Sequence, residues 1–436
     1  MSAPVNLPPA PSVAEDVAGP PGHGATGGIS WRNTFSALKH RNFRLFFYGQ
    51  LISLIGTWMT TTAQGWLVYQ MTGSKALLGI VAAAASAPMF VFATWGGWAA
   101  DKYPKRSVLV ATQIMSMLLS LALAALVWSG HIRAWEIIVL AALGGVTMAF
   151  DMPARQSFVI EMTSREDLMN AISLNSSVFN SARVIGPSLA GILMAQVGIA
   201  MCFFLDGISF IAVIAGLLMM RLPQHKTATH AGGALLQSLE GFRYVWNRPR
   251  VLTILALFAV VGIFGWSYSV LMPAFARDVL HLGEQGYGIL TAGSGIGALV
   301  AALTIASVGH LLPSRTMALG GVWIFAVTLA LFAFNRNLIW SILLLAAGGF
   351  GMVLYFSTSN AVLQTIVPNE MRGRVMGIWT LIFGGMVPLG SLQAGLMADA
   401  LGTSTTIAIG AAICALAATV TLVVVRRREA RLSAAG

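Results

Sequence analysis

Three ionisable side chains lie inside long apolar stretches of this chain: Asp151, Arg183 and Asp206. A charge at membrane depth is costly, so each should face either a partner or a water-filled cavity. Burial makes a carboxyl group hold its proton, whereas a neighbouring guanidinium makes it release that proton. The three residues are therefore candidates for proton coupling.

Asp206 is the stronger proton-carrier candidate, because it stands alone in the apolar segment 203–208. The alternative is a permanent ion pair that locks two neighbouring helices together. Arg183 could pair with Asp206 or with Asp151, since each lies roughly 10 Å from it in depth at about 1.5 Å per residue. Asp151 could instead pair with Arg155, one helical turn further along, or line the end of a path.

Uncharged polar residues recur at helical spacing in the same stretches, and lipid offers such a row no partners. Each row faces either a central path or a neighbouring helix. The first apolar segment contains Gln50, Ser53, Thr57, Thr61 and Gln64, and the fifth contains Ser173, Ser176, Asn180, Arg183 and Pro187. In the second half, aromatic and amide side chains would suit a bulky, partly apolar ligand. These path candidates are Trp266, Tyr268, Tyr355, Asn360, Gln364 and Trp379.

Helices must position these residues. The chain is 57% hydrophobic and only 9% charged, whereas soluble domains are about 25% charged. Spanning strands would alternate in polarity, which these runs do not. Twelve runs are long enough to cross a membrane as helices. They cover about residues 44–71, 76–100, 107–129, 134–160, 168–197, 199–221, 251–277, 285–309, 314–335, 338–366, 374–398 and 402–425.

The basic residues predict the topology. Of the 26 Lys and Arg, 21 fall in loops and tails of one parity, four fall in the others, and Arg183 lies within a span. The basic side is the cytoplasmic side, so both termini are expected there. The net charge of +11 then needs no nucleic-acid partner. We expect a disordered cytoplasmic tail with a pre-helix segment at 1–42, halves at 43–222 and 250–425, a cytoplasmic linker at 223–249 and a basic cytoplasmic tail at 426–436.

A charged run at 97–106 separates the second and third spans and should form a short surface loop. Gly97 should allow close backbone approach, and Pro104 should end the preceding helix. The halves repeat weakly: Pro104-Lys105-Arg106 corresponds to Pro313-Ser314-Arg315, and Ala190-Gly191 to Ala394-Gly395. Two pseudo-symmetric six-helix halves form the architecture of many secondary transporters, which bind substrate between the halves.

These motifs resemble those of the major facilitator superfamily. Gly97, Asp101, Lys102, Lys105 and Arg106 match its signature between helices two and three, although Pro104 replaces a glycine and Ser107 a basic residue. Residues 183–191, which include Gly186, Pro187 and Gly191, are similar to the Gly-Pro segment of antiporter branches. Residues 150–156, 175–177 and 372–375 resemble the exporter branch that contains enterobactin exporters and macrolide or drug:proton antiporters.

The resemblance implies alternating access by rocking of the two halves. Asp101, with its basic neighbours and Arg155, would latch the cytoplasmic side by pairing with the basic network and a helix end of the other half. It also implies efflux by proton antiport across a bacterial inner membrane. A uniporter or importer on the same fold is the close alternative. A membrane receptor or a membrane-embedded enzyme belongs to a different class, and the paired halves and missing catalytic motifs disfavour both.

The remaining expectations concern partners and cofactors. The sequence contains no phosphate-binding loop, and its seven histidines have no metal-ligand spacing. We therefore expect neither a cofactor nor a metal site, and the proton gradient would supply the energy. The expected partners are a small-molecule substrate and membrane lipid, and the protein should act as a monomer.

Overall fold

The computed structural model describes residues 36–164, 166–221, 234–309 and 311–433, and all regular structure within these ranges is helical. Eleven helices are long and apolar enough to cross a membrane. A twelfth, α2 (Arg41–Thr72), is longer than most but less apolar because of its row of polar side chains, and it packs against α6 and α7. The predicted all-α fold with twelve membrane helices in two halves is confirmed.

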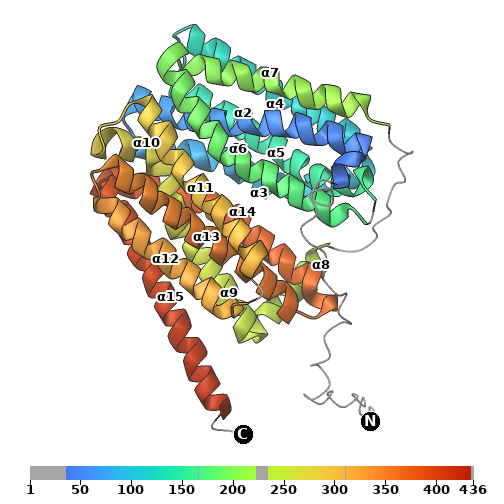
Figure 1. The fold of residues 1–436 in the computed structure, drawn as a ribbon, viewed down its shortest axis with the longest axis vertical. Helices are drawn as coiled ribbons and strands as arrows, with labels where there is room; N and C mark the ends of the chain where they lie inside the picture. The colour runs from blue at the N-terminus through green and yellow to red at the C-terminus, as the bar shows by residue number, and fades with distance from the viewer. Residues whose placement is uncertain (1–35, 165, 222–233, 310, 434–436) are drawn as a thin grey trace.

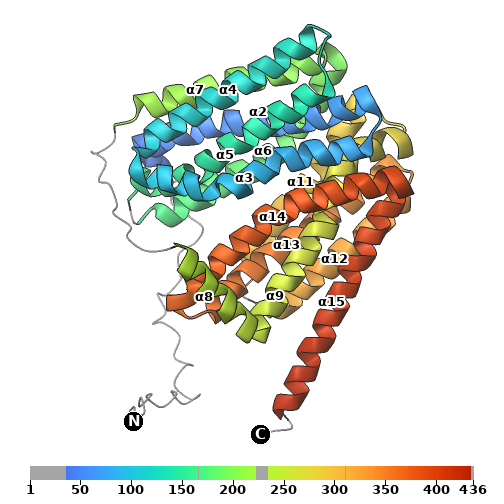
Figure 2. The same ribbon diagram turned by 180° about the vertical axis from the view of Figure 1, so that it is seen from behind.

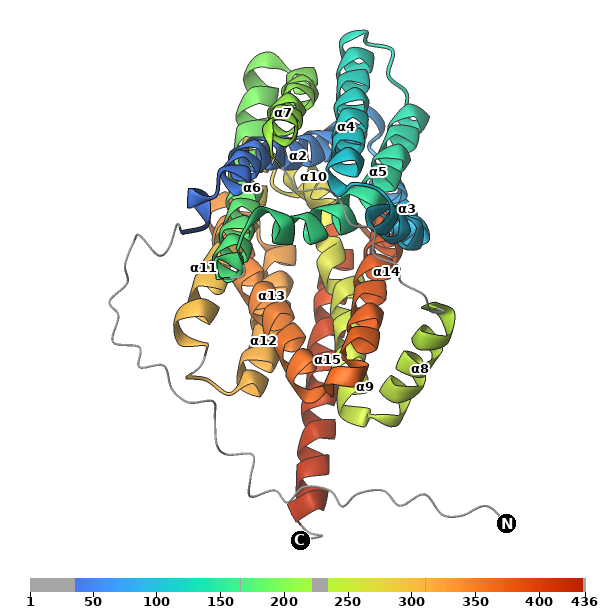
Figure 3. The same cartoon turned by 90° about the vertical axis from the view of Figure 1, so that its right-hand side faces the viewer.

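Each half is a six-helix bundle. A short 3₁₀ helix, η1 (Ser36–Lys39), precedes the N-terminal bundle, which contains α2, α3 (Lys75–Lys102), α4 (Lys105–Trp128), α5 (Ala134–Met162), α6 (Leu168–Val197) and α7 (Ile199–Met219). The described part of the linker forms a helix, α8 (Ala234–Asn247), which lies beside α9 and α14 (Figure 3). The C-terminal bundle contains α9 (Pro249–Val260) with its continuation, α11 (Glu284–Val308), α12 (Ser314–Phe334), α13 (Leu338–Ile366), α14 (Asn369–Leu401) and α15 (Thr403–Ser433).

The two bundles meet at one end and diverge toward the other (Figures 1 and 2). We call the diverging end, which carries η1, α8 and the C-terminal end of α15, the linker end, and the opposite one the far end. The last helix projects beyond its bundle at the linker end, so the start of the predicted basic tail is helical through Ser433.

The continuation of α9 is irregular. A π-helical turn, η2 (Val261–Gly265), is followed by a 3₁₀ segment, η3 (Trp266–Leu271), one α turn, α10 (Met272–Ala274), and a second π turn, η4 (Phe275–Val279). Gly262, Gly265 and Pro273 explain the irregularity, because glycine relaxes the backbone and proline cannot donate the helical hydrogen bond. Such turns inside a membrane helix commonly mark functional positions.

Two glycine contacts join the bundles toward the far end. Gly79 of α3 packs on α14, where an added Cβ would lie 2.4 Å from the carbonyl oxygen of Ser391 and 3.1 Å from Cα of Gly395. Gly288 of α11 packs on α6 in the same way, and an added Cβ there would lie 2.7 Å from Cα of Gly191. Gly288 follows Gly79 by 209 positions and Gly395 follows Gly191 by 204, so the two contacts are pseudo-symmetric copies.

The charged run 97–106 is mostly helical. The helix α3 extends through Lys102 and α4 begins at Lys105, so only two residues connect them. The expectation for Gly97 is wrong, because a Cβ there would meet nothing within 4 Å. Its neighbour Gly96 makes the close approach instead: an added Cβ there would lie 1.9 Å from the carbonyl oxygen of Ala149. The two glycines differ because successive residues face different sides of a helix.

Candidate functional site

Arg183 lies at the middle of α6, between the two bundles. The centre of its guanidinium is 5.9 Å from the ring of Trp58 in α2 and 5.4 Å from the ring of Trp266 in η3. The two indoles therefore flank the cation from opposite halves of the protein. Such contacts contribute about 0.5–1 kcal/mol each at accessible sites, less than the roughly 3 kcal/mol cost of a charge at mid-membrane.

Neither expected acid pairs with Arg183. Asp151 forms an ion pair with Arg155, at 2.6 Å from Oδ2 to Nη2, and accepts hydrogen bonds from Thr112 and Gln113 at 2.8 Å each. The predicted Asp151–Arg155 pair is thus confirmed. Among the described residues, no carboxylate forms an ion pair with Arg183, and the Tyr268 side chain lies close enough to interact with its guanidinium.

Asp206 lies inside the N-terminal bundle and is 2% exposed. It accepts a hydrogen bond from Ser120 at 2.8 Å, and Oδ1 would lie 2.6 Å from a Cβ at Gly56. Gly56 and Trp58 are two residues apart on α2, which places them about 200° apart around the helix. Asp206 and Arg183 therefore contact opposite faces of α2. The proton-carrier role of Asp206 remains a prediction.

A row of aromatic rings continues from Trp266 into the C-terminal bundle. Trp266 stacks on Phe356 at 6.0 Å, Phe356 contacts Phe258 at 4.9 Å, and Phe258 stacks on Trp379 at 3.6 Å between ring centroids. Sequence reasoning missed Trp58, Phe258 and Phe356. Nothing in the sequence distinguishes them from other aromatic residues, because their positions depend on which helices pack together.

The polar row of α2 divides between two environments. Gln50 is buried within its own bundle, with Oε1 unpaired, whereas Thr57 is exposed and Gln64 is half-buried. On α6, Ser173 and Ser176 are exposed and Asn180 is half-buried, so polar atoms lead from the linker end toward Arg183. Gly186 of the Gly-Pro segment contacts α2 beside Trp58, and Pro187 and Gly191 contact α11.

The path candidates of the second half are also dispersed. Tyr268 is buried, while Asn360 is half-buried and accepts a 2.6 Å hydrogen bond from the exposed Gln364. Tyr355 is buried inside the C-terminal bundle, where it lines a pocket of about 300 Å³ among α9, α12, α13 and α15. Among the path candidates of the second half, Trp266 is therefore the one whose ring lies beside the Arg183 guanidinium between the bundles.

Polar contacts join the bundles at the far end. The Tyr69 hydroxyl of α2 donates a hydrogen bond to Asp278 of η4, and Lys75 Nζ lies 4.0 Å from the same carboxylate. Trp66 Nε1 donates to Glu284 at 3.2 Å. These contacts involve positions that sequence reasoning did not select.

Asp399, near the end of α14, caps the first turn of α3 across the interface. Its oxygens accept hydrogen bonds from the backbone N–H groups of Lys75 at 2.9 Å and Ala76 at 3.1 Å, and from the Ser74 hydroxyl at 3.2 Å. A carboxylate at a helix N-terminus satisfies free N–H groups and interacts favourably with the helix dipole. Residues from both bundles thus complete one helix cap.

At the linker end, several polar contacts stay within the N-terminal bundle. Lys105 pairs with Glu161, and Arg106 donates to the carbonyl oxygens of Leu218 at 2.7 Å and Met220 at 3.3 Å. Lys102 lies over the Trp98 ring at 4.5 Å. Asp101 is exposed and has no hydrogen bond or ion pair with any described residue. Its predicted latch with the other half therefore remains a prediction. The two bundles diverge at this end of the molecule.

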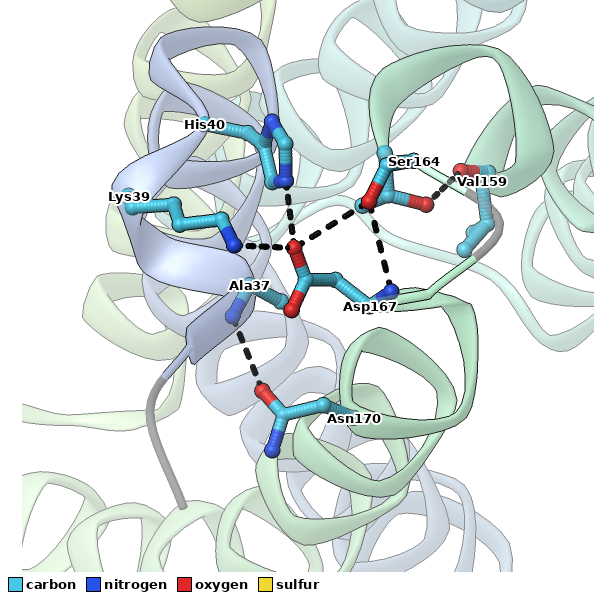
Figure 4. Close-up of polar contacts among 8 residues, drawn as sticks. Ala37, Lys39, His40, Val159, Ser164, Asp167 and Asn170 are labelled. Atoms are coloured by element: carbon cyan, nitrogen blue, oxygen red, sulfur yellow. Dashed lines mark hydrogen bonds and ion pairs between the residues drawn. The ribbon is translucent and has the colours of Figure 1, made fainter. Parts of the chain in front are cut away.

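A second linker-end cluster ties η1 to the start of α6 (Figure 4). Asp167 Oδ2 lies 2.7 Å from Lys39 Nζ and 2.8 Å from His40 Nε2, and it accepts a 3.1 Å hydrogen bond from Ser164. The Lys39 ammonium, with the His40 and Ser36 side chains, holds the pKa of Asp167 well below its usual range. This cluster stabilises the N-terminal bundle itself.

Comparison with known proteins identifies the fold and its family. A family model described as "Transmembrane secretion effector" matches residues 32–434. The chain belongs to this family. It is an integral membrane transporter of the major facilitator superfamily and not an enzyme, and the predicted resemblance to the exporter branch is confirmed.

Two relatives and one solved structure illustrate the match. The multidrug efflux pump Tap of Mycolicibacterium fortuitum is 30% identical over 83% of this chain and 90% of its own. The enterobactin exporter EntS of Citrobacter koseri is 28% identical over 80% of this chain and 84% of its own. A crystal structure of a bacterial homologue of the human lysosomal transporter Spinster superposes with a TM-score of 0.72 at 12% identity, covering 92% of this chain and 98% of the other, which shows the shared fold.

Proposed function

We propose that this transporter exports a small molecule across the bacterial cytoplasmic membrane by alternating access, driven by proton antiport. The linker end faces the cytoplasm, as the basic residues there favour. The observation that carries the proposal is the arrangement around Arg183. The bundles diverge at the linker end (Figure 1), and Ser173 and Ser176 on the part of α6 between that end and the half-buried Arg183 are exposed, which supports entry of a ligand from the cytoplasm. The efflux roles named for the two relatives support the outward direction.

Asp206 is the proposed proton carrier, because it is a membrane carboxyl group with which no cation of the described residues pairs, whereas Asp151 is held by Arg155. A carboxyl group in this environment can bind and release a proton if the packing of α2, α4 and α7 around it changes between states. Asp101 would latch the cytoplasmic end when the bundles close there. The protein acts as a monomer in lipid without a cofactor.

Everted membrane vesicles test this proposal. Respiration acidifies their interior, and a panel of anionic, neutral and cationic compounds is added while a pH-sensitive dye reports the gradient. An antiporter substrate should discharge the gradient in wild-type vesicles. Asp206→Asn should abolish that discharge while substrate exchange, measured without a gradient, continues. Transport of a substrate without any proton movement would contradict antiport and favour a uniporter.

A further inference from the structure

We infer that the substrate of this transporter is an organic anion with a flat aromatic or other apolar body, and that Arg183 binds its anionic group between Trp58 and Trp266. This inference rests on the proposed function and specifies the chemical class of its cargo. It begins with an unbalanced charge. Arg183 is half-buried at the centre of α6, and no described carboxylate pairs with it.

The indoles on either side cannot replace an anion. An indole ring offers the guanidinium its π electrons but no lone pair that could accept an N–H, so the five N–H donors of Arg183 would suit a carboxylate, sulfonate or phosphate, which could accept two of them. The two rings come from different bundles, and their centroids lie 5.9 Å (Trp58) and 5.4 Å (Trp266) from the guanidinium carbon of Arg183. An anion bound to the guanidinium would therefore lie close to an aromatic ring from each bundle.

The surroundings favour an aromatic or apolar remainder. The rings of Phe356, Phe258 and Trp379 continue from Trp266 into the C-terminal bundle. Of these, Phe258 is fully buried and therefore held in place by packing, whereas Phe356 is half-buried and keeps part of its ring accessible. On α6, the exposed Ser173 and Ser176 could form hydrogen bonds with a polar group that enters from the linker end.

The same site disfavours a cationic substrate. A free carboxylate would be the ionic partner of a cation, but Asp151 is occupied by Arg155 and Asp206 contacts the opposite face of α2. A cation between the bundles would meet the like charge of Arg183 instead. Selectivity therefore arises from both attraction of anions and repulsion of cations.

Binding to both bundles would also couple cargo to the conformational cycle. Trp58 moves with the N-terminal bundle and Trp266 with the irregular part of the C-terminal bundle. A ligand shifts an equilibrium only by its differential affinity for the states. A site completed by residues from both halves provides that difference.

Three probes with one ring system and different charges test the inference: 2-naphthoate, naphthalene-2-methanol and naphthalen-2-ylmethylammonium. Their dissociation constants are measured by calorimetry on the full-length protein in nanodiscs of phosphatidylcholine, which carries no net charge to compete. The wild type should bind naphthoate roughly tenfold or more tightly than the alcohol, and the ammonium most weakly. Arg183→Gln should remove this order. Arg183→Lys should keep it but weaken naphthoate binding severalfold, because an ammonium lacks the planar fork.

The matched control is Arg336→Gln, which removes one exposed positive charge between α12 and α13 and should change nothing. The inference is overturned if the wild type does not prefer the anion, or does not bind naphthoate at millimolar concentration. It is also overturned if Arg183→Gln keeps the wild-type preference. Because these assays need no transport, they can fail while proton antiport stands. Conversely, charge-selective binding at Arg183 can hold if the direction of transport proves inward.

Discussion

The two ends of the molecule use their polar residues differently. At the far end, Asp399, Asp278 and Glu284 of the C-terminal bundle bind groups of the N-terminal bundle. At the linker end, Glu161 and Asp167 bind partners within their own bundle. Rocking must therefore break the far-end contacts, whereas the linker-end contacts can persist in every state. Substitutions at the first should change the balance between conformations, and substitutions at the second should change stability alone.

The largest expected effect comes from filling a glycine contact. Gly79→Val would place a side chain 2.4 Å from a backbone oxygen of α14, and Gly191→Val would meet backbone atoms of α11 at 3.0 Å. Backbone cannot move aside as a side chain can, so the far end should no longer close and transport should fall to background. Spin-label distances across the far end should lengthen in both variants. Gly144→Val is the matched control, because a Cβ there meets nothing within 4 Å. Normal far-end distances in Gly79→Val would show that the interface is softer than the packing indicates.

A smaller shift should follow loss of the shared helix cap. Asp399→Ala removes three accepted hydrogen bonds. Loss of an N-cap side chain costs about 0.5–2 kcal/mol, so the far-end-open population should rise roughly twofold to thirtyfold. Asp399→Asn should have less effect, because asparagine also caps helices well. The same spin-label distances report the populations. Equal effects of Ala and Asn would assign the contact to charge and not to hydrogen bonding.

The Trp66–Glu284 contact should contribute less. Trp66→Phe removes one hydrogen bond of 3.2 Å but keeps an aromatic ring that can stack on Tyr287, as Trp66 does at 5.3 Å. We expect a population shift of severalfold at most, corresponding to about 1 kcal/mol. Glu284→Gln is the companion variant, and it should shift the population no further than Trp66→Phe. A shift larger than that of Asp399→Ala would reverse the proposed ranking of the far-end contacts.

At the linker end, Asp167→Asn should leave the conformational balance unchanged and lower thermal stability. The pKa of Asp167 is depressed in the folded protein, so its contribution is complete above the unfolded-state pKa of about 3.9, declines as the pH falls below that value and is lost only as the pH falls through the lower folded-state pKa. Wild type and variant should therefore converge in melting temperature in acid. Glu166→Gln, which removes a neighbouring exposed charge, serves as the control. A stability difference that does not narrow at all between about pH 5 and about pH 2 would indicate that packing, not ionisation, is responsible.

The sequence predicted the fold well because hydrophobic runs and basic loops are local signals. The first span was recognisable despite its polar row, and the offset between halves anticipated Gly191 and Gly395, which the structure places in one contact each with Gly288 and Gly79. The site was harder to predict, since it depends on helix rotation. Gly96, not Gly97, packs closely, and Arg183 faces Trp58 and not an acid. Contacts such as Asp399 on α3 join residues more than 300 positions apart, and no local pattern indicates them.

The π turn at 261–265 and the 3₁₀ segment at 266–271 allow the seventh membrane helix to change its local winding. A π turn consumes more residues than an α turn, and a 3₁₀ turn consumes fewer, so one can be exchanged for another with little change in helix length. Each residue passed along in this way turns the side chains beyond it by about 100°. The helix can thus rotate part of its length about its own axis as well as tilt with its bundle. Trp266 could swing away from Arg183 while the two ends of its helix stay attached to their own neighbours.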